Sequence, residues 1–191
     1  MLNLTDRALV IVDLETSGVN PFAHEVLAVG LVPMNDELPS TTVYVRPPEI
    51  RWSEYARKNF AKYEVAWEAQ ALGPTEACAQ IEDYLATTFG GAQTTAIGHN
   101  IGFDIAFLRK LAFLGGRDEL AGLSHRAIDT HTLLYVLAAL GRVPDACVTS
   151  TGAFRQFGIE VPEAERHTAL GDAQATRELL RKLLPLFVRP E

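Results

Sequence analysis

The sequence predicts an α/β fold in which a mixed five-stranded sheet carries helices on both faces. Three observations lead to this prediction. The length of 191 residues suits one compact domain. Hydrophobic residues make up 48% and charged residues 21%, which are ordinary values for a globular protein. Three apolar, strand-like segments come first, and alternating helix and strand patterns follow them, as expected for a sheet with helices packed against it.

The first three elements are expected to be strands. Residues 8–12 form a short β-branched run of the kind found in buried central strands. Residues 26–32 and 41–45 predict two more strands, and the Pro, Asn and Asp residues of 33–40 favour a turn between them. Residues 46–73 mix charged and aromatic side chains and indicate short, irregular helices. The aromatic side chains of that segment are those of Tyr55, Trp52, Phe60, Tyr63 and Trp67.

Helices and strands are expected to alternate from Pro74 onward. Pro74 follows a glycine and is typical of a first helical turn, and Gly90 and Gly91 end this helix. The elements expected after it are a strand at 94–97, a helix at 102–114, a strand at 127–128, a helix at 133–140 and a helix at 170–184. Asp129 or Thr130 is placed to cap the helix at 133–140.

Composition excludes several classes of protein. The longest apolar runs, 8–12 and 133–140, are far shorter than the ~20 residues that a membrane span needs. The N-terminus does not resemble a secretory signal, and two cysteines cannot make a disulfide framework, so a cytoplasmic location is expected. The net charge of −7 argues against an electrostatic grip on long nucleic acid. It leaves room for an enzyme whose carboxylates hold divalent cations that meet the phosphate.

Asp13 and Glu15 form the first group of candidate site residues. They follow the first expected strand, and side chains at positions i and i+2 point to the same side. Ligand crevices in open α/β sheets lie beyond the carboxyl ends of strands. On this pair alone, a solvent-facing acidic strand end is the simpler interpretation.

Three further candidates lie at the starts of helices. Asp104 is expected in the first turn of the helix at 102–114, where an acid also compensates the helix dipole. His167 and Asp172 are five residues apart, which is about 140° around an ideal helix. We therefore expect His167 on the loop before the last helix and Asp172 in its opening turn, from where both can reach one crevice.

Together these segments supply four carboxylates and one histidine. Carboxylate oxygens are the ligands that Mg²⁺ and Mn²⁺ prefer, and Mg²⁺ usually completes its shell with water and substrate phosphate. Two such ions at ~3.5–4 Å can clamp the attacking and leaving oxygens of a phosphodiester. The sequence therefore predicts a site for two Mg²⁺ or Mn²⁺ ions, whose charge would balance the four carboxylates.

The segments DLETSG, GHNIGFDIAFL and HTALGDAQATRELL resemble the three motifs of the DEDDh exonuclease family. That family includes the proofreading epsilon subunit of bacterial replicative DNA polymerase, RNase T and oligoribonuclease. The match spans residues 8–184, with the motifs in the expected order. The resemblance implies a ribonuclease H-like fold, a single exonuclease domain at 1–191, and 3′→5′ release of nucleoside monophosphates.

The resemblance also implies a role for each site residue. Asp13 would bridge both metal ions, Glu15 and Asp172 would complete the first metal site, and Asp104 would hold the second ion. His167 would accept the proton of the attacking water. We expect the four nearby carboxylates to raise the pKa of His167 when no metal is bound.

Thr16 and Ser17 are implied to bring their backbone close to the terminal nucleotide. Ser17 departs from the usual threonine at that position. Asp129 also fits the family pattern, and we interpret it as a helix cap instead of a further metal ligand. His99 and Asn100 are expected to shape the turn before Asp104.

Single-stranded or frayed 3′ ends of DNA are the favoured substrate, because Ala-Gln-Ala-Thr after Asp172 is closer to the epsilon group than to oligoribonuclease. Two alternatives stay open: an exoribonuclease that trims RNA, and a catalytically silent nucleic-acid-binding module. Arg109, Lys110 and Arg166 could meet phosphate or could be solvated helix charges. The aromatic side chains of 52–67 could stack on bases, although packing against the sheet is the favoured interpretation. No membrane partner is expected, and nothing in the sequence indicates stable association with a polymerase or an oligomeric state.

Overall fold

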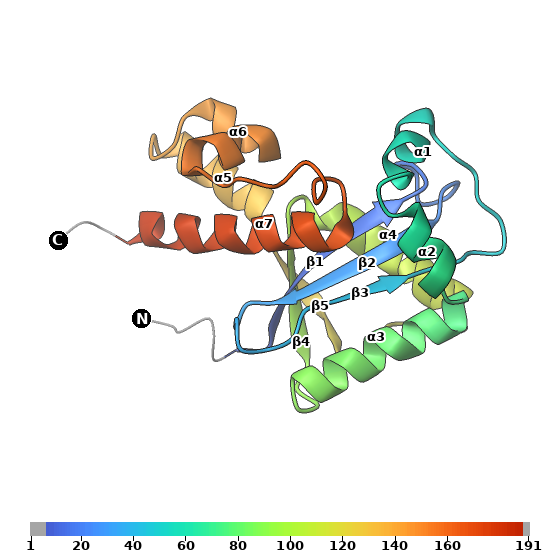
Figure 1. Ribbon diagram of the computed structural model, residues 1–191. Coiled ribbons are helices and arrows are strands. Elements are labelled where there is room, and N and C mark those ends of the chain that lie inside the picture. Colours follow the sequence, from blue (N-terminus) through green and yellow to red (C-terminus); the bar gives the residue numbers. More distant parts are fainter. Residues whose placement is uncertain (1–6, 189–191) are drawn as a thin grey trace.

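The computed structural model describes residues 7–188 and contains a mixed five-stranded sheet between two layers of helices (Figure 1). The strand order is β3-β2-β1-β4-β5. The strands are β1 (Leu9–Thr16), β2 (Val26–Pro33), β3 (Thr41–Tyr44), β4 (Thr94–Gly98) and β5 (Leu123–Asp129). β1 pairs antiparallel with β2 and parallel with β4. The α/β fold class predicted from the sequence is confirmed.

The two faces of β1 belong to different helical layers because successive side chains point to opposite sides of a strand. Val10 and Val12 face α3 (Pro74–Thr88) and α4 (Ile101–Leu114) in the larger core cluster. Leu9 and Ile11 face the other layer and pack with Ala173 of α7 (Ala169–Leu183). Asp13 and Glu15 continue the Leu9 and Ile11 face, so they point toward the start of α7.

The first turn of α7 lies directly against the sheet at Gly30 of β2. Gly30 pairs with Asp13, and a Cβ atom at Gly30 would lie 2.2 Å from the carbonyl oxygen of Ala169. Any side chain at this position would therefore force main-chain atoms apart. The missing side chain lets the N-terminus of α7 approach the sheet beside Asp13.

A second helical subcluster covers the outer part of the α7 layer. It comprises α5 (Thr130–Ala139), the 3₁₀ helix η1 (Asp145–Val148) and α6 (Ser150–Phe157), and the 3₁₀ helix η2 (Leu184–Phe187) follows α7. Its buried core includes Leu134, Phe154 and Leu179. Within residues 7–188, no helix is both long and apolar enough to cross a membrane.

The aromatic segment forms two short helices, α1 (Glu54–Phe60) and α2 (Glu64–Gln70). Phe60, Tyr63 and Trp67 pack with Leu27 of β2 in a cluster of their own. The indole nitrogen of Trp67 donates a hydrogen bond of 2.8 Å to the carbonyl oxygen of Val45. These three rings therefore pack the flank of the sheet, as favoured from the sequence, whereas Tyr55 remains 64% exposed.

Several elements differ from the expectation. β1 continues to Thr16 instead of ending at residue 12, so Asp13 and Glu15 lie within the strand, and the two 3₁₀ helices η1 and η2 were not predicted. β5 runs over seven residues instead of two, because it is an edge strand whose exposed middle carries His125 and Arg126 and therefore lacks an apolar signal. The sequence does not predict α6, because this helix is short and contains Gly152; its N-cap is Thr149, whose hydroxyl accepts from the Gly152 amide at 3.1 Å.

Candidate active site

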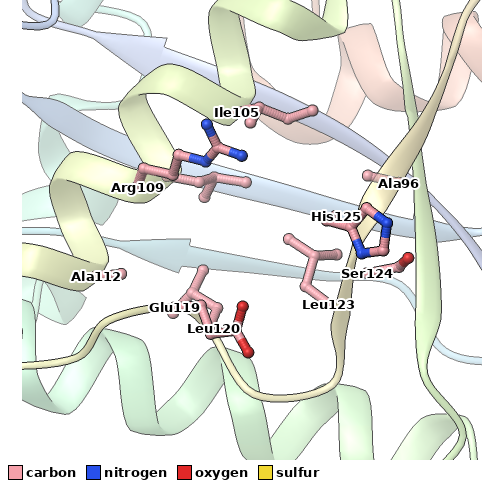
Figure 2. A pocket seen from close by; sticks show the side chains of 10 residues that line it. Ala96, Ile105, Arg109, Ala112, Glu119, Leu120, Leu123, Ser124 and His125 are labelled. Carbon is pink, nitrogen blue, oxygen red and sulfur yellow. The ribbon is translucent and has the colours of Figure 1, made fainter.

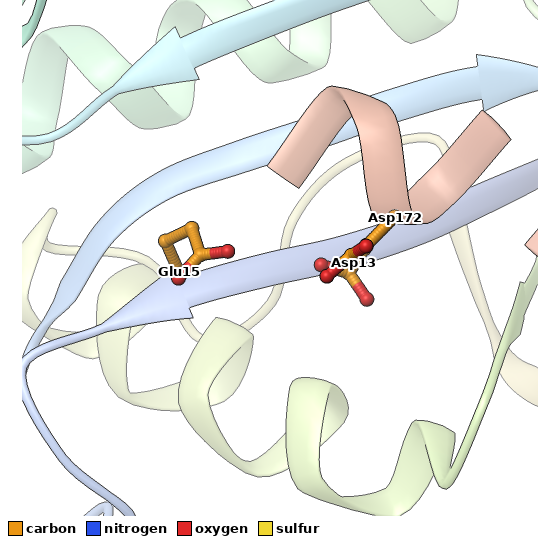
Figure 3. A group of neighbouring side chains, drawn as sticks. All are labelled: Asp13, Glu15 and Asp172. Carbon is orange, nitrogen blue, oxygen red and sulfur yellow. The ribbon is translucent and has the colours of Figure 1, made fainter. Parts of the chain in front are cut away.

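Three carboxylates meet at the carboxyl end of β1. Oxygen atoms of Asp13, Glu15 and Asp172 all lie within 4.8 Å of one another (Figure 3). Asp13 and Glu15 come from the strand, and Asp172 comes from the first turn of α7, whose N-cap is Thr168. Residues 159 positions apart in the chain are thus brought to one point, because α7 docks on the face of β1 to which Asp13 and Glu15 belong.

Asp104 reaches the same strand end from α4. It lies in the first turn of that helix, is only 5% exposed, and accepts a hydrogen bond of 3.1 Å from the Leu14 amide. It is outside the group of three oxygens that lie within 4.8 Å. Its negative charge nevertheless acts on Asp13. The structure therefore brings all four predicted carboxylates to the end of β1, three in close contact and one alongside.

The shared burial of these acids raises their pKa values. Burial is the largest cause for Asp13, and the charges of Asp104, Asp172 and Glu15 raise its pKa further. Burial and the charge of Asp172 raise the pKa of Glu15 to about 8. Burial also raises the pKa of Asp104 to about 7, although backbone hydrogen bonds oppose the shift. A group of acids that resists ionisation in this way is stabilised by protons or by bound cations.

His167 lies on the loop before α7, as expected, and Asp172 lies in the opening turn. The His167 amide donates to Oδ2 of Asp172 at 3.3 Å, and its Nδ1 lies 3.9 Å from the same oxygen. Its φ of 60° is in the left-handed region, which is uncommon for a residue with a side chain. An exceptional backbone conformation thus places this imidazole beside the acidic group.

The expected rise in the pKa of His167 is wrong. Burial lowers the pKa, and the positive charges of Arg166 and Lys62 lower it further, which outweighs the opposing effect of Asp172. Burial of the ring and the two cations beside it thus determine the direction of the shift, and the carboxylates do not. The imidazole is consequently neutral at pH 7.

Arg166 belongs to the site through Asp172. Its Nη1 lies 2.6 Å from Oδ1 of Asp172, and its guanidinium lies 5.2 Å from the centre of the Phe154 ring. The backbone amide of His167 donates a hydrogen bond to the other oxygen of the same carboxylate, Oδ2. Both oxygens of Asp172 are therefore oriented by the loop that carries the histidine.

The turn after β1 uses Thr16 and Ser17 in different ways. The Thr16 hydroxyl donates to the carbonyl oxygen of Gly18 at 2.8 Å. Ser17 is fully buried: its hydroxyl accepts from the Glu25 amide at 2.9 Å, and its own amide donates to the Glu25 carbonyl oxygen. The Ser17 carbonyl oxygen accepts from the Ser53 amide. Ser17 is thus held inside the turn, while Thr16 is only partly buried beside Glu15.

Asp129 caps α5 and also accepts a hydrogen bond from the turn before α4. Its carboxylate accepts from the amides of His131 and Asn100 and from the Thr132 hydroxyl, at 2.7–3.1 Å. Asn100 has a left-handed φ of 62° in the turn before Asp104. Burial and the nearby His131 lower the pKa of His99 to about 4, so His99 is a neutral partner of Thr130. These residues shape the turn, as expected.

The three candidate phosphate-binding residues, Arg109, Lys110 and Arg166, have different surroundings. Lys110 is paired with Glu25 at 2.7 Å and donates to the His24 carbonyl oxygen. Arg109 lines a separate pocket between α4 and β5, together with His125 (Figure 2). Arg166 alone of these three lies among the acidic residues.

Lys62 and Tyr55 contact the loop that carries His167. The ammonium group of Lys62 donates to the carbonyl oxygen of Arg166 at 2.8 Å. The Tyr55 ring meets the His167 ring edge-on, with centroids 6.0 Å apart. Their partners are more than a hundred residues away in the chain, and no local spacing pattern indicates such contacts.

Comparisons with known proteins agree with this geometry. No family model matches the sequence. A Rhodobacter capsulatus protein named DNA polymerase III subunit epsilon-like protein is 38% identical over 91 residues, which are 47% of this chain and 12% of that protein. E. coli exonuclease I, solved in complex with a dT13 oligonucleotide, matches with a TM-score of 0.74 at 17% identity, over 92% of this chain and 40% of that one.

A second similar structure identifies the fold. The nuclease domain of 3′hExo, described as a DEDDh family member bound to rAMP, matches with a TM-score of 0.72 at 15% identity, over 93% of this chain and 91% of that one. The chain has the fold of a DEDDh exonuclease. This fold agrees with the resemblance seen in the three motifs. The chain spans 12% of the curated relative and 40% of exonuclease I.

Proposed function

We propose that this chain is a metal-dependent 3′→5′ exonuclease domain that hydrolyses the terminal phosphodiester of DNA and releases nucleoside 5′-monophosphates. The observation that carries the proposal is the convergence of Asp13, Glu15 and Asp172 within 4.8 Å at the carboxyl end of β1. Asp104 and His167 stand beside this group. The similar structures support the proposal, because they are nucleases that share the fold of this chain.

The donor set fits Mg²⁺ or Mn²⁺. All four candidate ligands are carboxylates, which suit hard divalent cations, and burial together with mutual repulsion raises the pKa values of Asp13, Glu15 and Asp104, which a bound cation would oppose. Asp13, Glu15, Asp104 and Asp172 would hold two ions. When bound, such ions activate the attacking water and stabilise the charge on the leaving oxygen.

The protein itself supplies the proton acceptor and its orientation. His167 is neutral at pH 7, so its imidazole can accept the proton of the attacking water. Arg166 and the His167 amide hold the two oxygens of Asp172, which fixes the first turn of α7 relative to the imidazole. The partly buried Thr16 backbone is the candidate contact for the terminal nucleotide, and Ser17 holds the turn that presents it.

DNA is the substrate that we favour. The curated relative is named epsilon-like, and exonuclease I was solved with a DNA oligonucleotide. The second candidate function is hydrolysis of RNA 3′ ends, which the rAMP bound to the 3′hExo nuclease domain favours. The two candidates share the chemistry of the site and differ in the sugar of the terminal nucleotide.

Product analysis on matched oligonucleotides tests both candidates. Single-stranded DNA and RNA of one sequence are incubated with Mg²⁺, with Mn²⁺ or with a chelator, and the released nucleotides are separated. We expect mononucleotides from DNA with either metal and none with the chelator. Faster release from RNA would favour the second candidate. Binding of either oligonucleotide without any release would indicate a catalytically silent module.

A further inference from the structure

The loop that carries His167 is fastened from across the site by one lysine. We define the histidine loop as residues 162–168. The Nζ atom of Lys62 donates to the carbonyl oxygen of Glu163 at 3.1 Å, to the carbonyl oxygen of Arg166 at 2.8 Å and to Oε1 of Glu163 at 3.0 Å. An ammonium group has three N–H donors. All three are directed to this loop.

Lys62 is itself held firmly. It lies in the turn between α1 and α2, where its amide donates to the Asn59 carbonyl oxygen at 3.0 Å. The neighbouring rings of Phe60 and Tyr63 are buried in the aromatic cluster on the sheet. The Lys62 side chain is 25% exposed, and its contacts with the loop lie at the protein surface. The backbone around Lys62 is thus part of the packed flank of the protein.

The fastened carbonyl oxygen belongs to the residue immediately before His167. The guanidinium group of Arg166 meanwhile pairs with Asp172. The next residue, His167, has a left-handed backbone that persists only where its surroundings enforce it. α1 touches the loop a second time through the edge contact of Tyr55 with the His167 ring.

We propose that Lys62 is a positioning residue for His167, which holds the histidine loop so that the imidazole stays beside the acidic group. The role rests on the proposed exonuclease function. Because the three donors of Lys62 already have acceptors in the loop, the ammonium group has no N–H left for a substrate phosphate. Lys62 therefore acts on the rate of the chemical step through His167, and substrate binding does not depend on it.

The kinetic test compares Lys62→Met, Lys62→Arg and the control Lys58→Met. Lys58 is exposed near the end of α1, one turn before Lys62, and takes part in none of the ion pairs of residues 7–188. We expect Lys62→Met to lower kcat by roughly 10- to 100-fold, because a small misplacement of a catalytic group has that effect, with KM nearly unchanged. Lys62→Arg retains a charge and donors and should keep more of kcat than Lys62→Met. Lys58→Met should match the wild type.

A measurement without substrate tests the fastening itself. Hydrogen exchange of the backbone amides of 163–167 should be several-fold faster in Lys62→Met than in the wild type and in Lys58→Met, because released loops open more often. Each variant should keep its stabilisation by Mn²⁺, and Lys62→Met should show slightly more of it, since Lys62 makes no hydrogen bond to a proposed ligand but its positive charge acts on Glu15.

The outcomes separate this inference from the proposed function. A wild-type protein without metal-dependent hydrolysis contradicts the proposed function, whatever the exchange data show. With an active wild type, an unchanged kcat in Lys62→Met contradicts the positioning role. A rise in KM alone would instead make Lys62 a substrate-binding residue, and unchanged amide exchange would contradict the fastening.

Discussion

Asp13 is surrounded by more like charge than any other site residue described above. Burial and the charges of Asp104, Asp172 and Glu15 all raise its pKa, and only Arg166 opposes them. In the metal-free protein its carboxylate is therefore a source of repulsion. In the proposed metal complex it is the central ligand. The Asp13 side chain should thus destabilise the metal-free protein and stabilise the metal-bound protein.

The variant Asp13→Asn tests this double role. Without metal, we expect its melting temperature to exceed that of the wild type, because the amide relieves repulsion among the acids. With Mn²⁺, we expect a smaller rise in melting temperature than the wild type shows, because an ion stabilises the folded state in proportion to its affinity. Thermal unfolding with chelator and with Mn²⁺ gives both values. A full Mn²⁺ response in Asp13→Asn would remove Asp13 from the ligand set.

His167 is the residue whose replacement should separate catalysis from metal binding. We expect His167→Ala to lose roughly 10²–10⁴ in turnover, the usual effect of removing a positioned base, and to keep its stabilisation by Mn²⁺. Because the pKa of His167 is lowered from 6.5, the part of the pH–rate profile due to this residue should rise below neutral pH. His125→Ala, on the exposed edge strand β5, is the matched control. Wild-type turnover in His167→Ala would assign the proton transfer to another group.

At the scale of elements, the site depends on how closely α7 approaches β2. Gly30 faces the first turn of α7 and pairs with Asp13. We expect Gly30→Ala to destabilise the fold by about 1–3 kcal/mol, because the new Cβ atom meets main-chain atoms and packing must shift. Turnover should fall as well, because the shift moves Asp172 away from Asp13.

Chemical denaturation and initial rates measure the two effects of Gly30→Ala. Gly102→Ala serves as the control for stability, because a Cβ atom at Gly102 meets nothing within 4 Å and alanine is the better helix former. Equal stability of Gly30→Ala and the wild type would mean that α7 can move at no cost. The proposed link between helix docking and the acidic group would then be wrong.

The elements that the sequence predicted well are those with strong local signals. The β-branched runs at 26–32 and 41–45 became β2 and β3, and the glycine and proline around Pro74 marked the start of α3. The edge strand β5 and the short helix α6 carry mixed or polar residues, so their boundaries depend on packing that hydrophobic patterns do not report.

In the candidate site, too, the residues with a strong local signal were predicted, and the contacts between distant segments were not. The acidic residues were predicted because each stands at a strand end or in a first helical turn, where the sequence position limits the geometry. The contacts of Lys62 and Tyr55 with the histidine loop were not predicted, since they join segments about a hundred residues apart. The pKa of His167 was mispredicted for a related reason: its direction depends first on burial, and also on Arg166 beside it and on Lys62, which only the fold brings near.

At the scale of the whole molecule, the net charge of −7 matters most for stability at the acidic group at the end of β1. Glu15 and Asp104 bind protons more tightly in the folded state than in the unfolded chain, because their pKa values rise from 4.5 to about 8 and from 3.8 to about 7. Their contribution to stability is therefore complete below pH ~4 and is lost as the pH rises through the folded-state pKa values.

This linkage predicts how the metal-free protein responds to pH. We expect its melting temperature to fall as the pH rises from about 5 to about 8, and Mn²⁺ to reduce that fall by supplying the missing positive charge. Glu15→Gln should flatten the pH dependence. Thermal scans in chelator across this range test the prediction. A melting temperature that stays constant or increases with pH would show that these acids are ionised without cost.

The central claim is that the acidic group at the end of β1 hydrolyses nucleic acid from the 3′ end with the help of metal ions. The most direct measurement follows a 5′-labelled single-stranded DNA with the wild type and with Asp13→Asn, each with Mn²⁺ or with chelator. We predict stepwise shortening from the 3′ end by the wild type with Mn²⁺ alone, and intact DNA in the other three reactions. Intact DNA in all four reactions would contradict the claim, as would equal shortening by Asp13→Asn or in the presence of chelator.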